Sequence, residues 1–433
     1  MDSLVDDVLA EILLRLPPKS VLRCHAVSKR WRRIATCRTF VAAYSRHQRL
    51  ELLVYPDGYH LDRNAKNILA GLDPLNSDYS GCRRFLRLDD GRSLRLADSR
   101  DGLLLLAASD NGTFLICNPA TRQSAVLPSL TPDPCASAVP SGLYFHEPSG
   151  EHRLLCIGRL QLQHDNHPPS SSDAATVSVT GPFHYYILST GSAAVRRLGP
   201  AGGLGVAPSA CVALAGVLYW SHHPESGTSV DLVAFDTVSE KFRLIPRPPL
   251  TRRHYLRVFD MEGTLAVSAV AEGSLHMDVW ALETEGDPSS SVAAWARRLR
   301  IDLPWQRLRE SEFQPIDQAV AVVEGGLLLV VGSGYLLLYD VKEKRKVSRV
   351  YYGEIGNVSR CLYRASLVPL PVPPCPGTAD ASSSLHYYRP DDPYPSYFGR
   401  SRDWFVPDLE YAWYLRYKDI DSLRPDIFVK DHS

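Results

Sequence analysis

The sequence lacks the features that mark most secreted, membrane and metal-binding proteins. Its nine cysteines are scattered and contain no C-x-x-C pair, so neither a zinc ribbon nor a redox dithiol is indicated. No basic segment precedes an apolar core at the N-terminus, which argues against a secretory signal. The most apolar stretch, residues 319–339, is interrupted by glycines and predicts two buried strands rather than a membrane helix.

The sequence also has no excess of charge of either sign. Lys plus Arg and Asp plus Glu each number 48, so the formal net charge is zero. Global electrostatics therefore predict neither nucleic-acid binding nor attachment to an anionic membrane. Because no nucleophile elbow, P-loop, dinucleotide fingerprint or zincin motif occurs, we predict no catalytic residue, no cofactor and no metal.

Three aspartates nevertheless keep an enzymatic alternative open. Asp236, Asp278 and Asp340 could be imagined as paired carboxylates of a propeller-fold hydrolase. They occupy similar positions in the repeats described below, where aspartate commonly accepts hydrogen bonds from turn backbone, so we interpret them as turn residues. The histidines of His222–His223 and His164–His167 lack nearby acidic or cysteine partners at metal-ligand spacing.

The first part of the chain has helical spacing. Four apolar residues, spaced four apart, place a stripe on a first helix: Leu4, Val8, Ile12 and Leu16. Pro17–Pro18 ends this helix, and Ser20 and Ser28 are expected to begin a second and a third. Three short helices enclose little core on their own, so the stripe is expected to find a partner.

A pattern typical of short β-strands begins near Ser99 and recurs, with variations, to about residue 370. Each copy has a glycine, an apolar strand, a turn, a second strand that ends in a polar turn, and a third strand. The copies are anchored at residues that recur at intervals of 46 to 71: Asn118, Ser189, Asp236, Leu282 and Asp340. Kelch-like propeller blades repeat at about 50 residues, so the pattern predicts a degenerate propeller, for which we expect six blades.

The predicted organisation has five parts. A helical domain occupies residues 2–42, a connector 43–97, the propeller 98–370, and a Pro/Ser-rich loop 371–384. An aromatic tail, residues 385–433, is expected to pack on the propeller. The fold class is therefore multi-domain, a small all-α unit of three short helices followed by an all-β propeller.

The N-terminal pattern resembles the F-box motif. The matching residues are Leu4, Val8-Leu9, Ile12-Leu13, Arg15-Leu16-Pro17, Leu22-Arg23, Val27-Ser28-Lys29, Trp31-Arg32 and Phe40. Val5 departs from the motif, because the family usually has proline after the first leucine. This departure is the one sequence hint for an alternative, a non-ligase propeller scaffold with a degenerate F-box.

The β-rich part resembles the F-box-associated propeller of plant F-box proteins. The most recognisable stretch is Gly216-Val217-Leu218-Tyr219-Trp220, followed by Phe235-Asp236 and by Glu240 and Phe242. Together the two resemblances imply a non-catalytic substrate receptor of a Skp–cullin–F-box ubiquitin ligase. Such a receptor binds a Skp-type adaptor, and through it a cullin–RING assembly, while its propeller holds a protein substrate for ubiquitination.

The resemblance and the charge pattern also suggest contact residues. Adaptor contacts are expected from Leu4, Val8, Ile12, Leu16, Pro17, Leu22, Val27, Trp31 and Arg32. Arginines near predicted loops could read phosphate or acidic peptides: Arg122, Arg196, Arg197, Arg252 and Arg253. The absence of a signal peptide favours the cytoplasm or the nucleus, and the basic run at residues 29–33 is read chiefly as the solvated face of a helix.

Overall fold

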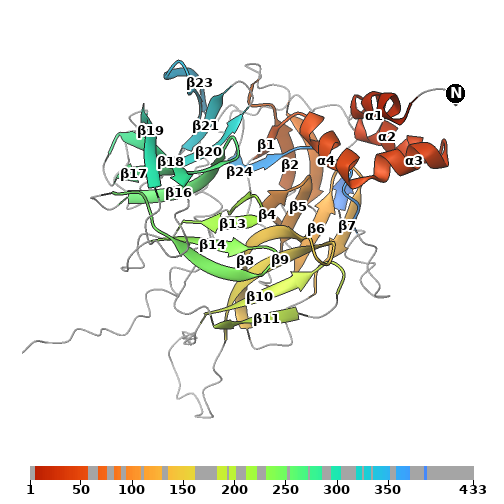
Figure 1. Cartoon of the computed structure of the whole chain (residues 1–433), viewed down its shortest axis with the longest axis horizontal. Helices are drawn as coiled ribbons and strands as arrows, with labels where there is room; N and C mark the ends of the chain where they lie inside the picture. The colour runs from red at the N-terminus through yellow and green to blue at the C-terminus, as the bar shows by residue number, and fades with distance from the viewer. Residues whose placement is uncertain are drawn as a thin grey trace, which may run out of the picture.

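The computed structural model describes most of the two domains. The described residues are 5–56, 67–75, 82–88, 94–108, 112–128, 135–160, 183–192, 195–200, 211–221, 231–250, 254–271, 274–284, 294–303, 318–323, 326–332, 335–351, 357–370 and 385–387. Figure 1 shows a cluster of helices at the edge of a ring of antiparallel sheets.

Four helices form the N-terminal domain, one more than expected. They are α1 (Asp6–Leu14), α2 (Pro18–Cys24), α3 (Lys29–Thr36) and α4 (Arg38–His47). The second begins at Pro18 rather than at Ser20, because proline suits the first turn of a helix, where its missing N–H is not needed. Ser28 caps α3 as predicted, and its Oγ accepts a hydrogen bond from the backbone N–H of Trp31 at 3.2 Å.

The helical core draws on residues from both ends of the chain. Its buried members are Leu13, Leu14, Val21, Ala35, Phe40, Tyr44 and Leu367. Tyr44 is fully buried, and its hydroxyl donates to the carbonyl oxygen of Leu16 at 2.8 Å. Because Leu367 follows the last inner strand of the ring, the small helical domain completes its core with a residue from the β domain.

The ring has six blades, as predicted. Blade 1 consists of β1 (Glu51–Tyr55), β2 (Asn67–Leu72), β3 (Arg83–Leu88), β24 (Asn357–Tyr363) and β25 (Leu385–Tyr387). Blade 2 consists of β4 (Arg95–Arg100), β5 (Leu103–Ala107), β6 (Phe114–Asn118) and β7 (Gln123–Val126). Blade 3 consists of β8 (Cys135–His146), β9 (Glu151–Leu160), β10 (Phe183–Ser189) and β11 (Val195–Pro200).

The remaining blades follow in chain order. Blade 4 consists of β12 (Val212–Leu214), β13 (Val217–Trp220), β14 (Leu232–Asp236) and β15 (Lys241–Ile245). Blade 5 consists of β16 (His254–Met261), β17 (Thr264–Ala271), β18 (His276–Thr284) and β19 (Ala294–Asp302). Blade 6 consists of β20 (Gln318–Val323), β21 (Leu327–Gly332), β22 (Tyr335–Asp340) and β23 (Arg345–Tyr351).

The prediction of a connector over residues 43–97 is wrong. This range contains the end of α4, three strands of blade 1 and the start of β4. Strand β1 pairs with β2 on one side and with β24 on the other, for example at Val54 and Val358. Blade 1 therefore combines the two ends of the β domain and closes the ring, which removes the open strand edges that a linear array would leave.

Little of the expected aromatic tail can be compared with the structure. Residues 385–387 form β25, which pairs with β3 on the outer edge of blade 1. Residues 371–384 and 388–433 lie outside the described residues.

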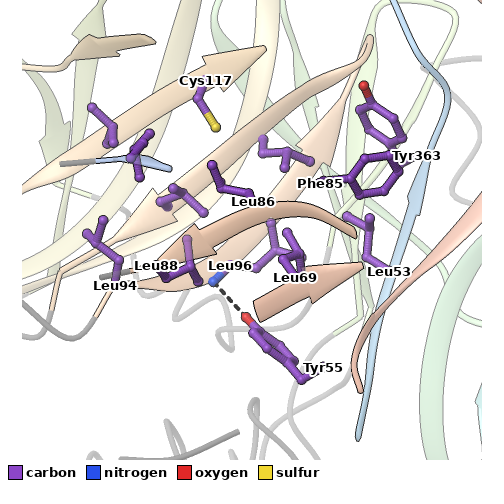
Figure 2. Close-up of a cluster of buried hydrophobic side chains, with 14 of the residues drawn as sticks. Leu53, Tyr55, Leu69, Phe85, Leu86, Leu88, Leu94, Leu96, Cys117 and Tyr363 are labelled. Atoms are coloured by element: carbon purple, nitrogen blue, oxygen red, sulfur yellow. Dashed lines mark hydrogen bonds between the residues drawn. The ribbon is translucent and has the colours of Figure 1, made fainter. Parts of the chain in front are cut away.

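Neighbouring blades pack through apolar side chains, as Figure 2 shows for blades 1 and 2. Leu53, Leu69 and Leu86 of blade 1 and Leu104 of blade 2 are fully buried in this cluster. The Tyr55 hydroxyl accepts a hydrogen bond from the backbone N–H of Leu96 at 3.1 Å. Each buried leucine of this kind contributes about 2 kcal/mol through the hydrophobic effect, so the blades depend on their neighbours.

Two of the three aspartates weighed as possible catalysts are turn residues. Asp236 and Asp340 are each the last residue of the third strand of a blade, and their carboxylates accept backbone N–H groups two and three residues later, at 2.6 to 3.1 Å. Asp278 differs, since it lies within β18 and pairs with Arg300 at 2.8 Å. Its assignment to the turn position is therefore wrong.

Candidate protein-binding surfaces

The helical domain exposes an apolar face. Val5, Val8 and Ile12 are 64%, 44% and 41% exposed, and their spacing places them on one side of α1. Val27, between α2 and α3, is 62% exposed. Leu9 and Leu13, on the other side of α1, are buried in the core. Val5, Val8 and Ile12 are therefore the exposed apolar residues of α1, and exposed apolar patches are a common feature of protein-binding surfaces.

The predicted adaptor contacts fall into two groups in the structure. Val8, Ile12 and Val27 are exposed, as are Pro17 and Arg32. Three others pack partly against the helical core, namely Leu16, Leu22 and Trp31. Leu4 lies outside the described residues. Val5 was not among the predicted contacts because the motif has proline there, although its spacing relative to Val8 and Ile12 indicates the same side of α1.

An ion-pair network joins the helix that carries this face to α3. Asp6, at the start of α1, accepts hydrogen bonds from Arg30 at 2.6 Å and from Arg33 at 2.8 Å. The hydrogen bond from Arg30, followed by its positive charge and that of Arg33, lowers the pKa of the Asp6 carboxyl below its usual value, although desolvation acts against this. The network aligns α1 with α3 at the exposed apolar face.

The end of α4 is fixed to the propeller by Arg364. Its Nη1 donates to the carbonyl oxygens of Arg46 at 3.2 Å and Gln48 at 2.6 Å, where the helix ends. The same segment approaches Gly102 closely, because a Cβ at this glycine (φ 75°) would lie 2.2 Å from the Cβ of Ser366 and 2.8 Å from the carbonyl oxygen of Arg364. No side chain larger than hydrogen fits there without displacing the segment.

A second contact holds the start of α4. Arg38 pairs with the carboxylate of Glu147 in the β8–β9 hairpin of blade 3, at 2.9 Å. Its guanidinium also lies over the ring of Phe145, 4.9 Å from the centroid. Both ends of α4 therefore contact the propeller.

Comparison with known families agrees with both halves of this architecture. Residues 1–40 match the F-box domain, and residues 86–360 match the F-box associated beta propeller domain. The chain is an F-box protein. The propeller match begins within β3, so it omits β1 and β2, which the structure places in blade 1.

Relatives in Arabidopsis thaliana support this membership. F-box protein At3g07870 is 25% identical over 386 residues, which cover 82% of this chain and 88% of that protein. F-box/LRR-repeat protein At2g43260 is 24% identical, covering 86% of this chain and 84% of that protein. Putative F-box/kelch-repeat protein At1g13200 is 22% identical, covering 70% and 72%. All three share the family and most of their length with this F-box protein.

The stretch that most resembles the family forms the boundary between blades 3 and 4. Trp220 is fully buried, and its indole N–H donates to the carbonyl oxygen of Ser141 at 2.6 Å. Phe242 packs against Phe235, with ring centroids 4.8 Å apart, and against Tyr185 at 4.4 Å. These motif residues therefore have a structural role, which is to hold two blades together.

The arginines predicted to read anionic peptides are largely engaged within the propeller. Arg196 pairs with Glu240 of the next blade, and Arg197 contacts the ring of His184 at 2.8 Å. Arg122 lies in the β6–β7 hairpin with a positive φ of 59°. Arg252 and Arg253 lie outside the described residues. Of the described members, Arg122 lies in blade 2 and Arg196 and Arg197 in blade 3, so a shared anion-binding surface stays a prediction.

The described parts of the chain also bear on metal binding and on membrane insertion. Within them, no group of three or more His, Cys, Asp or Glu side chains could hold a metal ion. No helix in the same residues is long and apolar enough to cross a membrane. Residues 164–167 and 222–223, which include the histidine pairs, lie outside the described residues.

Burial changes the acidity of three cysteine thiols in the propeller. Burial raises the pKa of Cys82 to about 11 and that of Cys117 to about 12. Burial, with the nearby Asp98 carboxylate, raises the pKa of Cys211 to about 12. A thiol with so high a pKa is a weak nucleophile, which agrees with a packing role for these residues.

Proposed function

We propose that this F-box protein is the substrate-recognition subunit of a Skp–cullin–F-box ubiquitin ligase. In this proposal the F-box binds a Skp-type adaptor and the propeller holds a protein substrate, while the chain itself catalyses nothing. The observation that carries the proposal is that the helical domain exposes Val5, Val8 and Ile12 on one side of α1, and Val27 between α2 and α3, while none of the four belongs to the buried core. Family membership supports the same assignment.

The proposed mechanism is proximity. The receptor would raise the effective concentration of a substrate lysine near the ubiquitin-charged enzyme carried by the cullin–RING assembly. The contacts at both ends of α4 support this mechanism. A propeller held in one orientation relative to the F-box presents its substrate at a lower entropic cost than a flexibly linked propeller would. We place this activity in the cytoplasm or the nucleus, where such ligases act.

The test is co-purification of the full chain with a Skp-type adaptor, comparing wild type with Val27→Asp. Because Val27 is 62% exposed, the charge should spare the fold and disrupt only an apolar contact. We expect adaptor recovery to fall at least about tenfold. Trp31→Ala is a less selective variant, since Trp31 packs against the helical core.

The matched control is Val238→Asp. Val238 is 52% exposed in the β14–β15 hairpin of blade 4, far along the chain from the F-box, and undergoes the same chemical change. Adaptor recovery by this variant should equal that of wild type. Failure of the wild-type chain to bind any Skp-type adaptor would reject the receptor and favour a propeller scaffold with a degenerate F-box.

A further inference from the structure

A cleft opens at the perimeter between blades 5 and 6. The two blades are joined by one parallel bridge between inner strands β16 and β20, at Asp260 and Ala321. Farther out, a cavity of about 540 Å³ lies between β19 of blade 5 and β22 and β23 of blade 6. Its volume is in the range of ligand-binding pockets, about 300–1,000 Å³.

The walls of the cleft are predominantly basic. Five cationic side chains line it: Arg297, Arg298, Arg300, Lys344 and Lys346. Only one carboxylate, that of Asp302, belongs to the lining, and it contacts His276 at 2.8 Å.

Part of this positive charge is balanced from behind the cleft. Asp278 accepts two hydrogen bonds from Arg300 at 2.8 Å and lies 3.9 Å from Arg297, and Glu283 pairs with Arg298 at 3.2 Å. Lys344 and Lys346 make no ion pair with any residue in the described ranges. The five lining cations therefore exceed the carboxylates of Asp278, Glu283 and Asp302 by two. This local excess stands in a chain whose formal net charge is zero.

The equivalent boundary between blades 3 and 4 is closed by an anion from the chain itself. Glu240 occupies the left-handed position of the β14–β15 hairpin, with φ 53°. Its carboxylate accepts hydrogen bonds from Arg153 and Tyr144 of blade 3, each at 2.7 Å, and pairs with Arg196 on the outer strand β11. Two arginines of one blade are therefore neutralised by a turn residue of the next.

Blade 6 has a lysine at this turn position. Lys344 has φ 51° in the β22–β23 hairpin, which corresponds to the hairpin that carries Glu240. It lines the cleft opposite the arginines of β19, the outer strand of blade 5. The boundary between blades 5 and 6 therefore lacks the internal anion that neutralises its counterpart.

We propose that this cleft binds an acidic segment of a partner protein, whose carboxylates take the place that Glu240 holds between blades 3 and 4. Lys344 and Lys346 are two residues apart, as are Arg298 and Arg300 on β19. Alternate residues of an extended strand lie about 7 Å apart, so Arg298 and Arg300 on β19 match the side-chain spacing of an extended peptide. Lys344, in the turn before β23, and Lys346, on β23, line the same cleft. The buried residues Leu299 and Tyr339 also belong to the lining of the cleft.

This proposal rests on the proposed function, in which the partner is a ligase substrate recognised by an Asp- or Glu-rich segment. Attraction of this kind acts over about 8 Å at physiological salt, so binding should weaken as salt concentration rises. Arginines and lysines at such a surface add selectivity against basic segments, which the same charges repel.

The experiment is a fluorescence-anisotropy titration of the full chain with a fluorescein-labelled hexaglutamate peptide, comparing wild type with Lys344→Glu. The new carboxylate can pair with the β19 arginines, as Glu240 pairs with Arg153 and Arg196. It would then compete with the peptide carboxylates for the same arginines. We expect peptide affinity to fall roughly tenfold. The melting temperature should be unchanged or higher, since glutamate already adopts this backbone conformation at position 240.

The matched control is Lys241→Glu, which makes the same charge reversal at an exposed position on the outer strand of blade 4. Its peptide affinity should stay within twofold of wild type, about the effect of one exposed charge. Equal losses in both variants would show nonspecific attraction and overturn the proposal, as would no saturable binding by the wild type. Both variants should retain the Skp-type adaptor, so failure of the cleft is distinguishable from failure of the receptor function.

Discussion

Glu240 has a left-handed backbone conformation in the β14–β15 hairpin. Its carboxylate interacts with Tyr144, Arg153 and Arg196 of the neighbouring blade 3. Its side chain is only 9% exposed, and that of Arg153 only 16%. Charges this poorly solvated are costly when their partner is removed, because water cannot replace the lost hydrogen bonds. At the residue scale, stability at this boundary therefore depends on one carboxylate.

We predict that Glu240→Ala lowers the free energy of unfolding of the propeller by about 3 kcal/mol. The reason is that Arg153 and Tyr144 lose their shared acceptor while remaining largely buried. Chemical denaturation of the full chain measures the change. Glu262→Ala is the matched control, since Glu262 has the same φ of 53° but is exposed, and a loss there as large as at Glu240 would contradict the explanation.

At the scale of elements, short helices and hairpins depend on side chains at their ends. The hairpins after the third strands of blades 4 and 6 are held by Asp236 and Asp340, and α3 begins at the hydroxyl of Ser28. A helix of eight residues has few internal hydrogen bonds, so its cap matters more than in a long helix. The orientation of Arg30 and Arg33 toward Asp6 depends on that first turn.

We predict that Ser28→Ala destabilises the first turn of α3 by about 1 kcal/mol. Backbone amides of this turn should then exchange with deuterium several-fold faster, which mass spectrometry of the full chain measures. Ser45→Ala, within α4 and away from a helix start, is the control and should leave exchange in α3 unchanged. Unchanged protection of α3 in Ser28→Ala would show that tertiary packing, rather than the cap, holds the helix.

At the scale of the whole molecule, residues distant in sequence join the two domains and close the ring. Strand β24 pairs with β1 some 300 positions earlier, where Val358 lies opposite Val54. The chain that follows β24 then returns to the F-box, where Leu367 enters the helical core and Arg364 binds the end of α4. The same stretch of chain therefore closes the propeller and orients the F-box.

We predict that Arg364→Ala loosens the junction at residues 46–50 without unfolding either domain. The carbonyl oxygens of Arg46 and Gln48 lose their donor, so trypsin should cleave after Arg49 several-fold faster in limited proteolysis. Arg345→Ala, at an exposed position on β23, should leave the cleavage rate unchanged. A junction as resistant in Arg364→Ala as in wild type would show that Leu367 and Arg38 suffice to hold it.

Local patterns in the sequence determined the class of each part of this protein. The F-box residues could be recognised because helical spacing, the Pro17–Pro18 break and the Ser28 cap act over short distances. The blades could be counted approximately because several hairpins carry their own turn residue, as Asn118, Asp236 and Asp340 do. Leu282, by contrast, lies within β18. Blade 1 escaped recognition because its strands come from residues 51–88 and 357–387, and no contiguous repeat spans them.

Tertiary structure alone decided which residues of a pattern face outward and which charges meet. Leu16 and Val8 share one sequence stripe, yet only Val8 is exposed, because α2 to α4 cover the other residue. Arg196 is paired through Glu240, whereas Lys344, at the same turn position as Glu240, faces arginines across an open cleft. Burial and charge pairing depend on contacts between segments that are distant in sequence. Short-range periodicity therefore cannot predict which residues are buried or which charges pair.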